Sequence, residues 1–332
     1  MPNRILVTGA SGFIGRALCN RLVSDGYEVI AAIRQAEADR PDPAVRYVQV
    51  GEVAGATDWT PAFYPSVGCA RAPVGCVIHC AGRAHVMGEG QSSRENPYFE
   101  TNVAGTEQLA KAAAAAGVGR FIFLSSIKVN GEETLGLKSF CEGDLPSPED
   151  DYGRSKWEAE KRLWVLSEAF DTGVTVVRMP LVYGPGVKGN LERLLSAVSR
   201  GILLPLGRSD NRRSMIGINN LVDFLVRCVW HPSAAGKTFL VSDSEEVSTA
   251  ELVRLMALGM GRRAPLLNLP LWLPKAIATF AGKKAEVNRL LGSLRVDSRF
   301  ARKTLEWEPP LSLEEGIRDM ALEYASVRDG RP

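Results

Sequence analysis

The stretch YGRSK, residues 152–156, places a phenol and an ammonium group four positions apart. At the start of a helix this spacing puts Tyr152 and Lys156 on one face. A free tyrosine titrates at a pH of about 10, and a neighbouring ammonium group favours its phenolate. Tyr152 is therefore predicted to act as a general acid or base near neutral pH. The pair alone is a weak signal, because it arises by chance in about one such chain in four.

A second polar group ends the apolar run FIFLSS, which is typical of a buried strand. Ser125 and Ser126 close this run, and Lys128 follows two positions later. We expect the strand to deliver a hydroxyl group at its carboxyl end, one loop before Tyr152. Lys128 has two open interpretations, a contact with substrate or a solvated loop lysine.

The segment TGASGFIG, residues 8–15, follows the apolar run RILV and opens a helical pattern. Its glycines allow a tight turn, close approach of the backbone to a ligand and close packing of helix on strand. The helix N-terminus then offers free N–H groups to a pyrophosphate. In this strand–turn–helix context the motif predicts a dinucleotide site. Its expected contacts are Gly9, Ser11, Gly12, Phe13, Ile14 and Gly15.

The elements that must position these residues alternate between short β-branched apolar runs and amphipathic helical stretches over the first half of the chain. This alternation predicts an α/β fold, a Rossmann-like doubly wound parallel sheet covered by helices on both faces. After Pro185 helical patterns dominate. We expect a dinucleotide-binding domain over 1–180 and a smaller, mostly helical substrate-binding lobe over 181–332, with part of 217–243 returning to the sheet.

The end of the second expected strand, AAIRQ, indicates which dinucleotide is preferred. An acidic residue there binds the ribose hydroxyls of NAD, whereas an arginine accommodates the 2′-phosphate of NADP. Arg34 occupies this place, and no carboxylate follows until Glu37. The sequence therefore favours NADP(H), with NAD(H) possible.

Composition excludes several other classes of protein. A net charge of +2 without a long basic run gives no reason to expect nucleic acid. The six cysteines form no CxxC pair and no metal-like cluster, which fits a reducing cytosol and predicts no metal site. No signal peptide is recognisable, and the apolar stretch 269–282 is too short and too interrupted to span a bilayer. We expect a cytoplasmic protein.

Nearly end to end, the chain resembles the extended short-chain dehydrogenases/reductases that act on nucleotide sugars. The motifs that carry the resemblance are TGASGFIG (8–15), HCAG (79–82), TNVAGT (101–106), FLSSIKVNG (123–131), YGRSK (152–156), RMPLVYGPG (178–186), RRSMIGINNLVD (212–223) and DSRFARKTLEWEP (297–309). The resemblance implies that Ser126 binds the sugar 4-oxygen, Tyr152 transfers the proton and Lys156 holds the nicotinamide ribose. It also implies cofactor contacts at Ala81, Gly82 and Asn102.

The substrate side of the resemblance rests on single positions. Asn190 and Arg213 match residues that contact the nucleotide diphosphate, and guanidinium groups pair well with phosphates. Arg289 is a second candidate for the diphosphate, and His85 is a candidate sugar contact or a loop histidine. Leu181 replaces the family's asparagine in the motif Asn-Val-Tyr-Gly-Pro.

Three functions follow from the resemblance. Sugar 4,6-dehydratases carry an acidic pair where this chain has Ile127 and Lys128, which argues against elimination. The remaining motifs look most like the branch found in bacterial O-antigen and capsule clusters. That branch contains UDP-hexose 4-epimerases, which retain their cofactor, and reductases that form UDP-N-acetylquinovosamine from its 4-keto-6-deoxy precursor with exchangeable NADPH. Arg34 favours the reductase. A non-catalytic dinucleotide-binding module is the third candidate, but the intact triad argues against it.

The family commonly dimerises through two helices of each subunit, here around 106–116 and 157–170. The second helix carries more apolar side chains than one face should need. We therefore expect a homodimer, with Leu163 or Trp164 near the centre of its interface.

Overall fold

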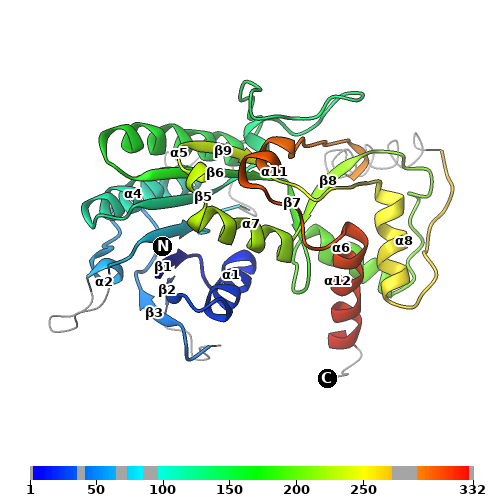
Figure 1. The fold of residues 1–332 in the computed structure, drawn as a ribbon. Coiled ribbons are helices and arrows are strands. Elements are labelled where there is room, and N and C mark those ends of the chain that lie inside the picture. Colours follow the sequence, from blue (N-terminus) through cyan, green and yellow to red (C-terminus); the bar gives the residue numbers. More distant parts are fainter. Residues whose placement is uncertain (1–2, 36–41, 65–72, 85–95, 271–289, 329–332) are drawn as a thin grey trace.

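A seven-stranded parallel sheet forms the centre of the computed structural model, which describes residues 3–35, 42–64, 73–84, 96–270 and 290–328 (Figure 1). Its strand order is β3-β2-β1-β4-β5-β6-β9, as predicted for a doubly wound sheet. The strands are β1 (Arg4–Thr8), β2 (Glu28–Ile33), β3 (Arg46–Gln49), β4 (Cys76–His79), β5 (Arg120–Ser126), β6 (Gly173–Met179) and β9 (Lys237–Leu240). The order reverses between β1 and β4, and ligands bind at the carboxyl ends of the strands beside such a point.

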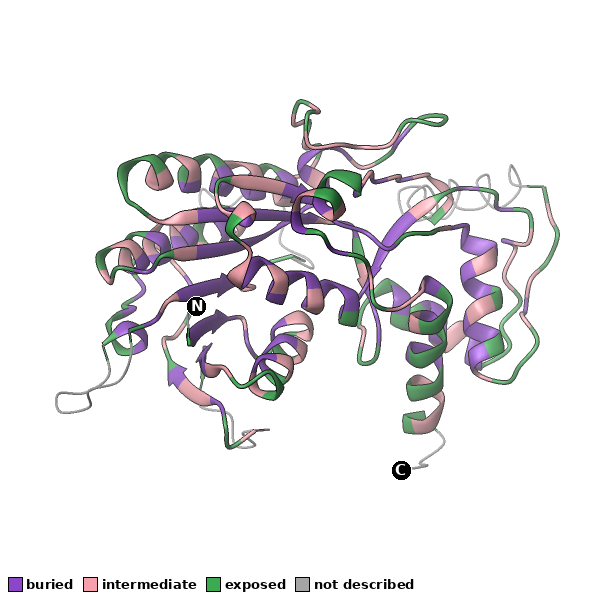
Figure 2. Ribbon diagram, in the orientation of Figure 1, coloured by how far each residue is buried: buried purple, intermediate pink, exposed green. Residues whose placement is uncertain are grey.

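Two layers of helices bury the two faces of the sheet. One layer contains α1 (Phe13–Ser24), α7 (Ile218–Trp230), η3 (Pro232–Ala234) and α11 (Arg299–Leu305). The other contains α2 (Thr60–Phe63), α3 (Pro97–Phe99), the π-helix η1 (Glu100–Ala104), α4 (Gly105–Ala115) and α5 (Asp151–Ala169). The strands are buried between these layers (Figure 2). Strands so covered read as continuous apolar runs, which is why their pattern was visible in the sequence.

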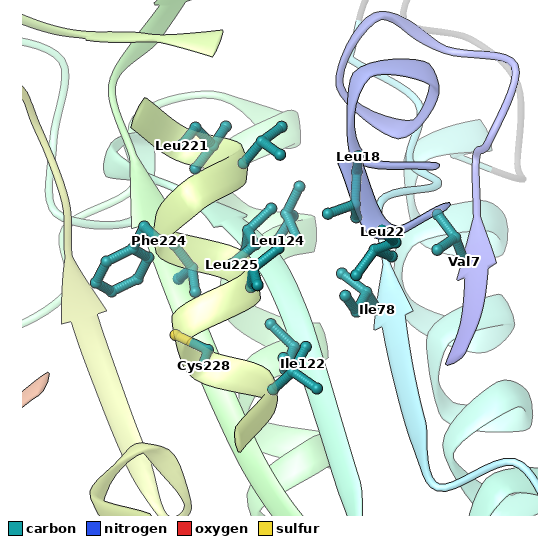
Figure 3. Packing of buried hydrophobic residues seen from close by; sticks show 14 of the residues in the cluster. Val7, Leu18, Leu22, Ile78, Ile122, Leu124, Leu221, Phe224, Leu225 and Cys228 are labelled. Carbon is teal, nitrogen blue, oxygen red and sulfur yellow. The ribbon is translucent and has the colours of Figure 1, made fainter. Parts of the chain in front are cut away.

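Helix α7 packs on the sheet although it comes late in the chain. Its residues Leu221, Phe224 and Leu225 share one core cluster with β5 and with α1 (Figure 3). Helix α7 begins directly after β8 (Arg213–Gly217), which belongs to a separate small sheet of order β10-β8-β7. The segment around 217–243 therefore links the substrate side of the molecule to the sheet.

The remaining elements pack around that small sheet. They are β7 (Leu181–Tyr183), α6 (Asn190–Ser199), β10 (Glu246–Val247), α8 (Thr249–Gly259) and α12 (Leu313–Arg328). Their buried residues form a core cluster of their own, centred on Tyr183 and Met256. The division of the chain into a dinucleotide-binding domain over 1–180 and a substrate-binding lobe over 181–332 stays a prediction.

The loop after β5 joins both parts of the molecule. It starts as a 3₁₀ turn, η2 (Ile127–Val129), and Phe140 further along it pairs with Val296. The neighbouring Leu294 pairs with Arg213 of β8. At the free edge of the large sheet, the N–H of Leu240 donates to the carboxylate of Glu142, 2.8 Å away.

Leu163 lies in the core and not on the surface of α5. Its side chain is fully buried between α5 and the sheet, and Trp164 packs against the same cluster. The expectation that Leu163 lies near the centre of a dimer interface is therefore wrong, because its own sheet covers it. The homodimer itself stays a prediction. Val165 is 67 % exposed on the same helix and is better placed to face a partner.

No helix within the described residues is long and apolar enough to cross a membrane.

Candidate active site

The glycine turn between β1 and α1 is shaped for a ligand that approaches the backbone. Gly9 has a φ of 65°, and a Cβ atom there would lie 2.7 Å from the Ala81 nitrogen. A Cβ atom at Gly15 would lie 2.2 Å from the Gly9 oxygen, so only glycine lets α1 start this close to the turn. Gly12 caps α1 without a side chain, which leaves first-turn N–H groups for a phosphate. The turn therefore fits a dinucleotide.

Ser11, Phe13 and Ile14 also lie in this turn. Ser11 is exposed at the tip, whereas Phe13 and Ile14 are half-buried and pack against the core under α1. The two apolar side chains anchor the first turn of the helix, so their contribution to cofactor binding would come from their backbone.

Arg34 ends β2 as predicted, but a carboxylate lies beside it. Its guanidinium is 3.6 Å from Glu52, and both side chains are largely exposed. Glu52 follows β3, the strand next to β2, so sequence distance hid this neighbour. The place expected to receive the 2′-phosphate of NADP thus carries a positive charge from Arg34 and a negative charge from Glu52.

A chain of neutral hydrogen bonds joins the cofactor strands to the helices. The Thr8 hydroxyl accepts from the Ala81 N–H at 3.2 Å and lies 2.6 Å from Nδ1 of His79. On the other side of the ring, Nε2 lies 3.0 Å from the Thr106 hydroxyl, which itself donates to the Asn102 carbonyl. The Thr106 hydroxyl donates its only proton to the Asn102 carbonyl, so it must accept a hydrogen bond from Nε2 of His79. Nδ1 of the neutral ring therefore accepts from the Thr8 hydroxyl. Burial lowers the pKa of His79 to about 3 and keeps the ring neutral.

Asn102 continues this chain to the catalytic helix. It lies in η1 and is 1 % exposed. Its Oδ1 accepts from the Arg83 N–H at 2.8 Å, and its Nδ2 donates to the Ser155 hydroxyl at 2.9 Å. Ser155 in turn donates to the Tyr152 carbonyl at 2.8 Å. The side chain of Asn102, predicted to contact cofactor, thus holds the loop after β4, at Arg83, to α5.

Ser126, Tyr152 and Lys156 meet where β5 ends. Ser126 caps η2 by accepting from the Lys128 N–H at 3.2 Å, and its hydroxyl lies near enough to Tyr152 to lower the pKa of that phenol. The Lys156 ammonium donates to the Leu124 carbonyl at 2.9 Å. A Cβ atom at Gly82 would lie 3.0 Å from this ammonium, so a larger residue there would displace it. The strand end, the helix start and the glycine therefore position the three groups together.

Burial dominates the titration of both Tyr152 and Lys156. It raises the pKa of Tyr152 to about 12, against the hydrogen bond from Ser126, which lowers it. It lowers the pKa of Lys156 to about 8, against the carboxylate of Glu160, which raises it. In the polypeptide without cofactor, the pKa of Tyr152 therefore lies above its ordinary value. A pKa closer to neutrality stays a prediction, because it also depends on the charge of a bound nicotinamide.

Lys128 is held by two carboxylates. It donates to Glu132 at 2.8 Å and makes a closer contact with Asp150. Burial works against its charge, but these two acids raise the pKa of Lys128. Asp150 also caps α5 by accepting from the Gly153 N–H at 2.7 Å. Lys128 thus ties the loop after Ser126 to the helix that carries Tyr152, a role outside both sequence interpretations.

Two of the predicted diphosphate contacts, Asn190 and Arg213, lie on α6 and β8. Asn190 is exposed at the first position of α6, after Gly189 with a φ of 77°. Arg213 is half-buried at the start of β8 and donates to the Gly292 carbonyl at 3.1 Å. Burial lowers the pKa of Arg213, and Glu133 opposes this. His85 and Arg289 lie outside the described residues.

Glu160 and Arg178 were missed by the sequence analysis. They form a buried ion pair of 2.6 Å directly behind the catalytic strand end. Two signals were available. Glu160 stands four positions after Lys156, and Arg178 is a charged residue at the end of an otherwise apolar strand. Within the described residues, no group of His, Cys, Asp and Glu is arranged to hold a metal ion.

This fold and this triad define a short-chain dehydrogenase/reductase of the extended type. Residues 5–242 match the NAD dependent epimerase/dehydratase family, and the chain belongs to that family.

Named relatives agree with this assignment. A UDP-glucose 4-epimerase of Vibrio cholerae is 44% identical over 99% of this chain and 98% of its own. An N-acetyl-alpha-D-glucosaminyl-diphospho-ditrans,octacis-undecaprenol 4-epimerase of Escherichia coli is 26% identical over 98% of this chain and 96% of its own. Among solved structures, MoeE5 in complex with UDP-glucose and NAD has a TM-score of 0.74 and 26% identity, covering 98% of this chain and 99% of MoeE5.

Proposed function

We propose that the protein is a UDP-hexose 4-epimerase that works with a retained NAD. The observation that carries the proposal is the convergence of Ser126 at the end of β5 with Tyr152 and Lys156 of α5, where Ser126 lowers the pKa of Tyr152 and Lys156 donates to the Leu124 carbonyl. The 44% identity to the Vibrio cholerae epimerase supports the same reaction.

The residues divide the reaction between them. Ser126 and Tyr152 bind O4 of the sugar, and Tyr152 takes the proton of this hydroxyl as C4 becomes a ketone. NAD, which the glycine turn between β1 and α1 would hold, would supply an acceptor for the C4 hydride and a hydride donor for the ketone. Tyr152 then gives its proton back to O4. The sum contains no net oxidation, so one cofactor serves many turnovers.

The charges of the site explain why NAD is needed for the proton transfer as well. Tyr152 has a raised pKa in the polypeptide, which favours its acid form and opposes the first step. A positive nicotinamide ring stabilises the phenolate, since an opposite charge nearby lowers the pKa of an acid. Lys156 contributes the second positive charge as long as it stays protonated.

Arg34 supports a second candidate, the NADPH-dependent reduction of UDP-4-keto-6-deoxy-N-acetylhexosamine to UDP-N-acetylquinovosamine. In that reaction C4 accepts a hydride and Tyr152 protonates O4 once, so the cofactor must exchange. A guanidinium at the end of β2 suits a 2′-phosphate, but Glu52 beside it repels one. For this reason we rank the epimerase first.

One experiment separates the two functions. Purified protein is denatured and its released nucleotide identified, and the native protein is incubated with UDP-glucose or UDP-N-acetylglucosamine without added cofactor. An epimerase releases NAD and forms the 4-epimer. A reductase releases little NAD, leaves both sugars unchanged and consumes NADPH only with the 4-keto sugar. The lipid-linked sugar in the name of the Escherichia coli relative is a further substrate to include.

The Arg34→Glu variant tests the cofactor argument separately. A charge-assisted contact is worth about 1.5–3 kcal/mol, so an NADP-dependent enzyme would lose at least tenfold in kcat/KM with NADPH relative to NADH. An unchanged ratio would show that Arg34 is a solvated partner of Glu52 and would remove the support for the reductase.

A further inference from the structure

Glu160 is a fully buried carboxylate one helical turn after Lys156 on α5. Both of its oxygens accept from Arg178, at 3.1 Å and 3.2 Å from Nε and at 2.6 Å from Nη2. One oxygen also accepts from the Ser125 hydroxyl. Ser125 directly precedes Ser126 on β5. The Glu160 carboxylate is therefore hydrogen-bonded to this strand at the position next to the proposed catalytic serine.

Arg178 extends the pair to two more elements. It lies on β6 opposite Ser125 in the parallel register. Its Nη1 donates to Oδ1 of Asn130 at 3.1 Å, and its guanidinium lies 5.6 Å from the centre of the Trp157 ring. Asn130 follows η2, the turn capped by Ser126. The ion pair therefore joins α5, β5, β6 and the loop that leaves the catalytic serine.

A buried ion pair is rarely the most stable way to join elements. The free energy needed to remove two charges from water often exceeds their mutual attraction, and apolar side chains of similar volume would stabilise the fold as well or better. Serine and asparagine partners complete the hydrogen bonding here, so the pair is fully satisfied. This arrangement suits a pair that orients the neighbouring site.

The surroundings of Lys156 show which group the pair can affect. The titratable groups that face the ammonium are His79 and Cys80 from the end of β4 and Glu160 from its own helix. His79 is neutral, and burial raises the pKa of the Cys80 thiol so that it is neutral too. Of the groups that raise the pKa of Lys156 in the described structure, Glu160 has the largest effect.

We propose that Glu160 and Arg178 form a positioning pair for the reaction, with Glu160 holding Ser125 and the charge of Lys156 while Arg178 balances and orients Glu160. The inference rests on the function proposed above. Neither residue touches the expected place of the sugar. Both act through the residues that do.

The proposal predicts opposite effects for the two halves of the pair. Glu160→Gln leaves Arg178 without its counter-charge, so the alkaline limb of the epimerase pH profile, where Lys156 loses its proton, should move to lower pH. Arg178→Gln leaves Glu160 uncompensated, and the limb should move to higher pH. The downward shift should be about one pH unit, the scale for one nearby charge acting on a buried group. The upward shift should be smaller, because Arg178 is not among the charges that act directly on Lys156. A purely structural role would lower kcat in both variants without moving the limb in opposite directions.

A direct titration tests the pair without any activity. The ε-carbons of lysine are isotope-labelled, and the NMR signal of Lys156 is assigned by its absence in Lys156→Met. The apparent pKa of this signal should fall in Glu160→Gln and rise in Arg178→Gln. If wild-type protein converts no sugar, the proposed function fails while this titration still decides the positioning pair.

Two further variants keep the outcome clear. Glu158→Gln makes the same change on the outer side of α5, where Glu158 pairs with the exposed Arg162, and should leave the titration unchanged. The double variant Glu160→Gln/Arg178→Gln removes both buried charges and suits the case in which a single variant does not fold. Because Glu160 acts on Lys156 from the same helix, the double variant should shift the pKa down by less than Glu160→Gln. Identical pKa values in wild type and the double variant would overturn the proposal.

Discussion

The two sides of Lys156 are held together by different chemistry. On the side of β1 and β4, the connections are neutral hydrogen bonds that run through Thr8, His79 and Asn102. On the side of β6, the connection is the charged pair of Glu160 and Arg178. The neutral side keeps its protons over a wide pH range and so fixes geometry. The charged side acts on the titration of Lys156, because the Glu160 carboxylate raises the pKa of this ammonium group.

This contrast has a physical basis in what each side faces. A dinucleotide is anionic, and its phosphates find N–H groups at the glycine turn, so further charge beneath the turn would disturb that site. The proton transfer, in contrast, needs a lysine that stays charged in a dry site. A nearby carboxylate supplies this, because desolvation alone lowers the pKa of a lysine.

The largest expected effect on activity comes from a substitution of Tyr152, the residue at which both sides meet. Tyr152 is linked to the neutral chain through its carbonyl and Ser155, and to the end of β5 through Ser126. Tyr152→Phe should keep its fold and its NAD but lose about two to four orders of magnitude in kcat. Circular dichroism and released NAD serve as controls. A near wild-type rate would assign the proton transfer to another residue.

The neutral side, which contains His79, should lose stability in acid. In the unfolded chain His79 takes up a proton near its ordinary pKa of 6.5, whereas the folded pKa is about 3. Between these values the unfolded state binds more protons, so stability falls as pH falls. From pH of about 7 to about 4.5, the stability lead of wild type over His79→Gln should shrink by about 3 kcal/mol, measured by urea unfolding. A constant lead would mean that His79 is already charged in the fold.

The charged side should show the same sign, a stability that rises with pH, but in alkali. The pKa of Lys156 is lowered from 10.5 to about 8, so between these values the unfolded state again binds more protons. Wild type should therefore gain stability relative to Lys156→Met as pH rises through this window, by about 2 kcal/mol up to a pH of about 9.5. Wild type and Lys156→Met are both measured without NAD. A relative stability that does not change with pH would contradict the lowered pKa.

The smallest expected effect concerns the cap of α5. Asp150→Ala removes both the cap of the catalytic helix and a partner of Lys128, and should cost about 1 kcal/mol of stability together with part of kcat. Asp150→Asn retains a capping oxygen and should lose less. Asp151→Ala removes an exposed pair with Arg154 and serves as the control, with a change within about 0.5 kcal/mol. Equal losses in all three variants would rule out a specific role for Lys128.

The sequence predicted those features that are local. Apolar runs placed the strands of the large sheet, and fixed spacings gave the glycine turn and the pair of Tyr152 and Lys156. Parallel strands buried on both faces leave a strong pattern, and a helix brings positions four apart onto one face. These parts of the site could be read without knowing which strands are neighbours.

What could not be predicted depends on the order and register of the strands. Ser125 and Arg178 are far apart in the chain and meet because β5 pairs with β6. Arg34 and Glu52 meet because β2 pairs with β3. The burial of Leu163 was misjudged for a similar reason, because the apolar residues of a helix do not show which of them face its own sheet. The high pKa of Tyr152 reflects desolvation, which spacing alone does not reveal.

The contact between Glu142 and Leu240 bears on how copies of the protein behave at high concentration. β9 is the last strand of the sheet, and an open edge of this kind invites edge-to-edge pairing between molecules. Glu142 occupies one of its N–H groups and places a negative charge where another strand would dock. Burial raises the pKa of Glu142, so mild acid neutralises this charge sooner than that of an ordinary glutamate. The sheet edge is therefore expected to become more prone to self-association as the pH falls and Glu142 takes up a proton.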